Sequence, residues 1–169
     1  MIGLNLCPFA RGVSVKGQVR YAVSSATTTG ALVDDLDAEL QLLSVTAPAQ
    51  VDTTLLILPY VLADFLDYND FLDVADAAVE RMGLAAVVQV ASFHPRYQFA
   101  GTAAGDMTNY TNRSPYPILH LLREASVDAA VAAFPDAALI YQNNIDTMER
   151  LGLDGWIALG LDSPEENGS

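Results

Sequence analysis

The chain has 169 residues, about the size of one domain, and 51% of them are hydrophobic. This apolar content excludes a disordered chain, and the single cysteine excludes an internal disulfide framework. Eight basic residues against 21 acidic residues give a net charge of −13, which argues against binding to nucleic acid or to an anionic membrane. We expect one folded domain over residues 1–160 and an acidic, flexible tail over 161–169.

The apolar segments of the chain predict a cytoplasmic protein. The N-terminal apolar run is short, lacks preceding positive charges and ends at Pro8, so it does not have the pattern of a signal peptide. No stretch offers about 18 uninterrupted apolar residues, the length that a membrane-spanning helix needs. A lone thiol is compatible with a reducing compartment.

The first half of the sequence predicts alternating strands and helices. Residues 18–25 alternate with a period of two, as a strand does. A threonine-rich turn at 27–30, in which one Thr caps the next helix, leads to an amphipathic helix over 31–43. A nearly continuous apolar run at 53–58 predicts a strand covered on both faces.

A second helix and a third strand complete the predicted sheet. The helix is expected over 62–82, with Gly83 just beyond its end, and the strand over 85–91. The order β-α-β-α-β predicts an α/β fold with a small, mainly parallel sheet of three or four strands joined by right-handed crossovers.

The second half of the sequence predicts a long loop followed by C-terminal helices. Residues 92–113 lack periodicity, and a loop of this length in a compact domain indicates either a functional segment or a missed element. Ser114 and Pro115 have the pattern of a helix start, and this helix is expected to continue to about residue 125.

Both histidines flank the irregular segment and are candidate catalytic residues. His94 follows the third strand, where ligands gather in α/β sheets. His120 lies four residues before Glu124 on the predicted helix, so both share one face. If the loop folds this helix over the strand end, His94, His120 and Glu124 converge in a set suited to a divalent metal such as zinc. The alternative is that both histidines are polar groups bonded to the backbone.

Cys7 is the third candidate catalytic residue. Pro8 favours the start of a helical turn, where local N–H groups and Arg11 would stabilise the thiolate. A thiolate with a nearby histidine is the core of a nucleophilic site. The alternative is a buried structural cysteine.

Four further residues are candidates for binding a small anionic ligand. Asn112 and Arg113 precede the predicted helix start at Ser114, a favourable place for an anion, and Arg96 adds positive charge from the same loop. Asn69 falls on the apolar stripe of the second helix, where it needs buried partners. The alternative for the arginines is pairing with nearby carboxylates.

Several long blocks of the sequence are similar to those of a known family. They are NLCPFA from residue 5, DYNDFL from 67, SFHP from 92 with YQFAG from 97, and NYTNRSPYP from 109 with HLLRE from 120. The blocks resemble an uncharacterised, mostly bacterial family of single-domain proteins, catalogued as a domain of unknown function. The resemblance implies no activity, but it places within shared motifs Cys7, Asn69, His94, Arg113, His120, Arg123 and Glu124.

Two functional hypotheses follow from the sequence. The first is an enzyme acting on a small anionic substrate, with Cys7, His94, His120 and Arg113 in one pocket. The second is a non-catalytic module that binds a small anion or docks to another protein. The sequence leaves the reaction and the oligomeric state open.

Overall fold

The computed structural model describes residues 3–4, 6–7, 10–133 and 137–160, and it contains one four-stranded sheet in the order β1-β2-β4-β3. β1 and β2 are parallel neighbours, whereas β4 is antiparallel to both β2 and β3. Three of the four strands therefore run in the same direction. Their bounds are β1 Val19–Val23, β2 Thr53–Ile57, β3 Val88–Phe93 and β4 Ile118–Arg123.

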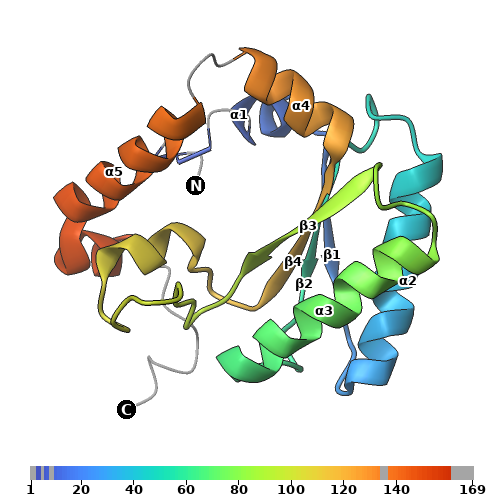
Figure 1. The fold of residues 1–169 in the computed structure, drawn as a ribbon, viewed down its shortest axis with the longest axis horizontal. Coiled ribbons are helices and arrows are strands. Elements are labelled where there is room, and N and C mark those ends of the chain that lie inside the picture. Colours follow the sequence, from blue (N-terminus) through green and yellow to red (C-terminus); the bar gives the residue numbers. More distant parts are fainter. Residues whose placement is uncertain (1–2, 5, 8–9, 134–136, 161–169) are drawn as a thin grey trace.

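The helices flank this sheet on two sides. Figure 1 shows α2 and α3 on one side of the sheet and α5 with the short 3-10 helix η1 on the other. Among the described residues, no helix is both long and apolar enough to span a bilayer. The helix bounds are α1 Ala10–Val15, α2 Thr29–Val45, α3 Phe65–Arg81, η1 Met107–Asn112, α4 Glu124–Ala133 and α5 Ala137–Ala158.

The predicted α/β class and the β-α-β-α-β order are confirmed. Thr28 caps α2, as the threonine-rich turn predicted, because its side chain accepts a hydrogen bond from the Ala31 N–H. α3 begins at Phe65 rather than at residue 62, because Leu62 has a left-handed backbone conformation with φ 58°. Asp64 then caps α3 by accepting from two backbone N–H groups. The predicted tail over 161–169 lies outside the described residues.

The helix predicted from Ser114 to about residue 125 is wrong, because this segment is strand β4. Pro117 disfavours helical backbone at Tyr116, so no helix continues from Ser114 and the chain bends at 115–116 before β4 begins. Burial then alternates at every residue of β4, with Leu119 and Leu121 fully buried. β4 lies between β2 and β3, so β1–β2 is the one parallel pair of neighbours.

The main core lies between the sheet and the two helices α2 and α3. Leu32, Leu36, Leu40 and Leu43 of α2 are fully buried, as their three- and four-residue spacing predicted. They pack with Tyr68 and its neighbours on α3 and with the inward side chains of the sheet. A second, smaller cluster joins the N-terminal segment, η1 and α5 through Leu6, Tyr110, Met148 and Trp156.

Thr54 gives the core a specific weakness. It is fully buried on β2, and its Oγ1 has no hydrogen-bond partner among the described residues. A buried hydroxyl without a partner costs free energy that an apolar group of the same shape does not. We expect Thr54→Val to raise the free energy of unfolding by about 1 kcal/mol in urea titrations followed by circular dichroism.

The adjacent Thr53 provides the matched control for this change. Its hydroxyl donates to Leu121 O at 2.8 Å and also contacts His120, so Thr53→Val removes bonds that exist. We expect Thr53→Val to destabilise the protein by about 1 kcal/mol. Equal effects of the two substitutions would contradict the assignment of Thr54 as the unsatisfied hydroxyl.

Candidate functional site

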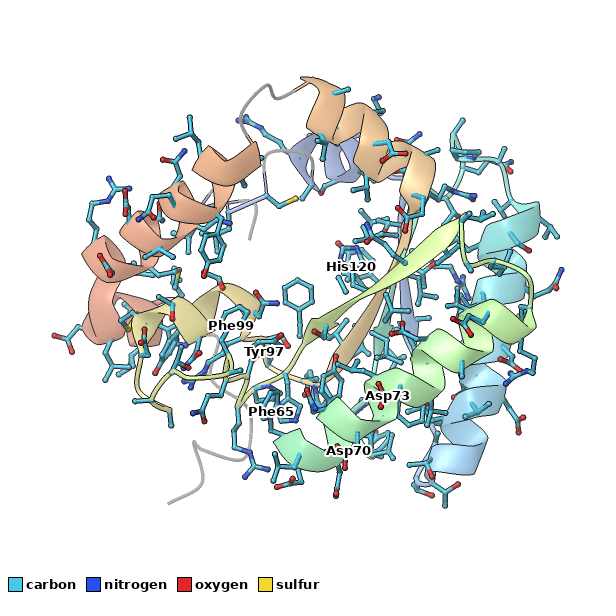
Figure 2. The ribbon with its side chains drawn as sticks, in the orientation of Figure 1. Phe65, Asp70, Asp73, Tyr97, Phe99 and His120 are labelled. Atoms are coloured by element: carbon cyan, nitrogen blue, oxygen red, sulfur yellow. The ribbon has the colours of Figure 1, made fainter. Side chains whose placement is uncertain are left out.

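The two histidines lie on opposite faces of the sheet and do not converge. The ring of His94 packs against Phe65 and Tyr68 of α3, at centroid distances of 5.4 and 5.1 Å. His120 alternates along β4 with the core residues Leu119 and Leu121, so it points to the opposite face. Figure 2 shows His120 on the side of the sheet turned away from the α3 residues Phe65, Asp70 and Asp73.

His94 is held by the backbone through both ring nitrogens. Its Nδ1 accepts from the Arg96 N–H at 3.0 Å, so the proton resides on Nε2, which donates to Leu62 O at 3.2 Å. The side chain is fully buried, and this burial lowers its pKa. This geometry corresponds to the alternative of a backbone-bonded histidine and leaves neither ring nitrogen free for catalysis.

The long loop is folded by its own polar side chains. Asn109 is fully buried, accepts from the Phe99 N–H and donates to Ala103 O. The Arg113 guanidinium donates to Ala104 O and lies 4.0 Å above the Tyr110 ring. These contacts close the loop onto η1.

Asn112 and Arg96 also have structural partners. Asn112 donates from its side chain to Ser92 O, at the end of β3. Arg96 donates to Ala63 O and pairs at 3.5 Å with Asp64, the N-cap of α3. The donors expected to bind an anion therefore contact carbonyls and one carboxylate of the protein itself.

Asn69 is exposed on α3, so the prediction that it is buried is wrong. The buried face of the helix centres on Tyr68, Phe71 and Ala75. Leu66 is 70% exposed, so it does not belong to this buried face. Leu72 is half-buried against the core, whereas Asn69 lies outside the buried face of the helix.

Cys7 and Glu124 lie in separate parts of the chain. Cys7 is half-buried, and its backbone carbonyl accepts from the Ala10 N–H at the start of α1. Glu124 opens α4, and its backbone N–H donates to Val87 O. In the described part of the chain, no group of three His, Cys, Asp or Glu side chains is placed to hold a metal. The zinc set proposed from the sequence is therefore not assembled there.

The structure contains an open hollow of about 560 Å³ where β1 and β2 lead into α2 and α3. In α/β sheets, the carboxyl ends of parallel strands are the usual place for a ligand. A larger hollow of about 970 Å³ lies along α5, but Leu4 is the one apolar residue that lines it. The smaller hollow is lined by Thr27, Thr28, Thr29, Gly30, Val33, Val61, Leu62, Asp67, Asp70, Phe71 and Val74.

Specific hydrogen bonds build the two loops that form this hollow. After β1, the Ser24 hydroxyl donates to Asp35 and accepts from the Ala26 N–H, which turns the chain into α2. After β2, the His94 ring holds Leu62 O, and Arg96 holds Ala63 O. His94 and Arg96, which were predicted to be functional, therefore do not line the hollow but fix the backbone of the loop that forms one of its walls.

The hollow combines an apolar floor with negative charge. Asp67 and Asp70 are exposed on α3, and neither forms an ion pair among the described residues. At the start of α2, the N–H groups of Thr29 and Gly30 have no intrahelical acceptor. The lining residues include no Lys or Arg. The floor consists of Val33, Val61, Leu62, Phe71 and Val74.

Comparison with known proteins identifies a family. A family model described as "Protein of unknown function (DUF1415)" matches residues 1–158 of the chain. No curated protein and no solved structure matches the chain.

Proposed function

The chain belongs to the DUF1415 family of proteins of unknown function, and from its geometry we propose that it binds a small organic amine in the hollow between α2 and α3. The observation that carries the proposal is the pairing of an apolar floor with two carboxylates, Asp67 and Asp70, that have no cationic partner in the described residues. The ammonium group would lie at these carboxylates, and the apolar body on the floor.

The volume of the hollow and the electrostatic field of the acidic protein support this ligand class. A volume of about 560 Å³ is within the range of small-molecule sites, about 300–1,000 Å³. The net charge of −13 raises the local concentration of cations and lowers that of anions. The free N–H groups of Thr29 and Gly30 favour a ligand that also carries an acceptor oxygen. This combination favours an amine over the anion expected from the sequence.

The proposal is for binding rather than covalent catalysis. The residues that line the hollow include no cysteine and no histidine. Its side-chain chemistry consists of threonine hydroxyls and carboxylates, which position a ligand by hydrogen bonds and charge.

Calorimetry with three matched probes tests the ligand class. Phenylalaninol carries an ammonium group, a hydroxyl and a phenyl ring, whereas 3-phenyl-1-propanol lacks the ammonium and 3-phenylpropionate carries a negative charge instead. We expect phenylalaninol to bind at least about tenfold more tightly than either of the other two, because charge-assisted bonds to two carboxylates add about 1.5 kcal/mol or more. Tighter binding of the propionate, or no binding of phenylalaninol, would refute the proposal.

Substitutions on α3 test the location. We expect the double change Asp67→Asn with Asp70→Asn to weaken phenylalaninol binding about tenfold. The matched control is Asp73→Asn with Asp76→Asn, which removes two exposed carboxylates of the same helix that do not line the hollow. Equal weakening by both pairs would mean that the effect is long-range electrostatics and not contact in the hollow.

A further inference from the structure

The face of the sheet opposite α2 and α3 is mainly apolar and carries one histidine. Side chains on this face come from alternate positions of the four strands. The strand register makes Tyr21, Leu55, His120 and Ala91 successive cross-strand neighbours. None of the strand positions on this face is Asp, Glu, Lys or Arg. The rows on either side consist of Val19, Thr53, Leu122 and Gln89, and of Val23, Ile57, Ile118 and Phe93.

Figure 1 shows α5 and η1 on this side of the sheet, but in the described residues they pack mainly against each other. Their contact is made through Tyr110, which stacks edge-on against Trp156 at 5.1 Å, and through Met148. The central side chains of the face are half-buried, whereas Tyr21 and Val23 at the β1 edge are 64% and 66% exposed. The described helices therefore do not close this face as α2 and α3 close the other.

The hydrogen bonds of Thr53 fix the tautomer of His120. The Thr53 hydroxyl has one hydrogen, and it donates this hydrogen to Leu121 O at 2.8 Å, because a carbonyl can only accept. The contact of 2.7 Å between Thr53 Oγ1 and His120 Nε2 must then be a bond that the ring donates. The proton of the neutral ring is on Nε2, and Nδ1 keeps its lone pair.

His120 is therefore a fixed, neutral acceptor on an uncharged surface. Burial lowers the pKa of the ring to about 4, so it carries no charge near neutral pH. Nδ1 has no hydrogen-bond partner among the described residues. An imidazole with so low a pKa is a weak base, which favours a binding role over general base catalysis.

We infer that this face of the sheet binds a neutral aromatic molecule that donates one hydrogen bond to His120 Nδ1. Phe93, whose ring centroid lies 6.0 Å from that of His120, and the aliphatic residues Leu55 and Ile118 provide the contact surface for the ring of the ligand. The absence of charge on this face disfavours ions, so the ligand class differs from that of the amine site. The inference does not depend on the proposed amine site.

Indole and 1-methylindole form a matched pair of probes, because methylation removes the N–H donor and keeps the aromatic ring. We expect indole to bind about three- to tenfold more tightly than 1-methylindole, the ratio that one hydrogen bond confers. In the wild-type protein, nitrogen NMR of the imidazole rings should show that indole shifts the Nδ1 resonance of His120. The two nitrogens of His94, which are both bonded to the backbone, should not move.

His120→Phe removes the acceptor and should bring the affinity ratio of the two probes to about one, whereas Tyr21→Phe on the same face should leave the ratio unchanged. The inference fails if neither probe binds, if both bind equally to the wild type, or if His120→Phe preserves the ratio. If His120→Phe does not fold, the wild-type NMR titration decides: an unshifted Nδ1 resonance at saturating indole overturns the inference.

Discussion

Replacing Arg123 by methionine is expected to lower the free energy of unfolding by about 3 kcal/mol. The side chain is buried at the end of β4, and its Nη2 lies 2.6 Å from both Leu43 O and Thr46 O, where α2 ends. It also reaches Val51 O, in the segment that leads into β2. The guanidinium thus satisfies the last carbonyls of α2 and opposes the negative end of the helix dipole. Methionine keeps the apolar stem but leaves these carbonyls without a donor.

Arg81→Met is the control for this prediction, because it removes a guanidinium from the surface. Arg81 pairs with Asp37 at 2.6 Å, but its side chain is 54% exposed. Exposed ion pairs contribute about 0–1 kcal/mol, so urea unfolding of Arg81→Met should stay within that range. A loss below about 1 kcal/mol in Arg123→Met would show that water replaces the guanidinium at the end of α2.

The first half of the fold was predictable because each of its segments shows one clear period of apolar residues, either that of a helix or that of a strand. The leucines of α2 repeat on one face and polar residues occupy the other, so helix and core assignments agree. β4 was not predictable in the same way, since Ile118, Leu119, Leu121 and Leu122 place apolar residues on both faces and hide the period of two. One face of β4 is buried and the other is half-buried, so both faces carry apolar residues. The sequence of such a strand does not alternate between apolar and polar residues.

This one error determined most of the errors about the site. As part of a helix, His120 would share a face with Glu124, whereas in β4 it alternates with Leu119 and Leu121 and faces away from His94. Which face of a sheet a side chain occupies depends on the exact strand position, because a shift of one residue reverses it. The sequence identified His94 and His120 as unusual residues, but it could not assign their faces.

The hollow between α2 and α3 was missed for a different reason. Its walls come from two loops that lie far apart in the sequence, one at Thr27–Gly30 and the other at Val61–Leu62. Taken separately, the segments that line the hollow have ordinary interpretations. The threonines read as a helix cap, and the aspartates of α3, which follows the second loop, read as a solvent-exposed helix face. Only the parallel pairing of β1 with β2 places these segments side by side. A sequence signal exists in the combination of a Thr-Thr-Gly turn after one strand and spaced aspartates after the next.

Stability is expected to fall as the pH is lowered from 7 to 5, by about 2 kcal/mol from His120 alone. Burial lowers the pKa of this ring from 6.5 to about 4 in the folded protein. The unfolded chain therefore binds a proton at this ring below pH 6.5, whereas the folded chain binds it only near pH 4. The contribution of the neutral ring to the free energy of unfolding is complete above pH 6.5 and is lost as the pH falls. His94, whose pKa is also lowered by burial, adds a loss in the same direction.

Urea titrations at half-unit pH intervals measure this pH dependence of the free energy of unfolding. His120→Gln is the matching variant, because its side chain at this position does not titrate. We expect the variant to show a shallower dependence on pH between 5 and 7, with the remaining slope coming from His94. The carboxyl groups of Asp64 and Asp106 have pKa values lowered by backbone N–H bonds, so their contribution is lost only below this window. Equal slopes in the two proteins would mean that the His120 ring takes up its proton as readily when folded as when unfolded.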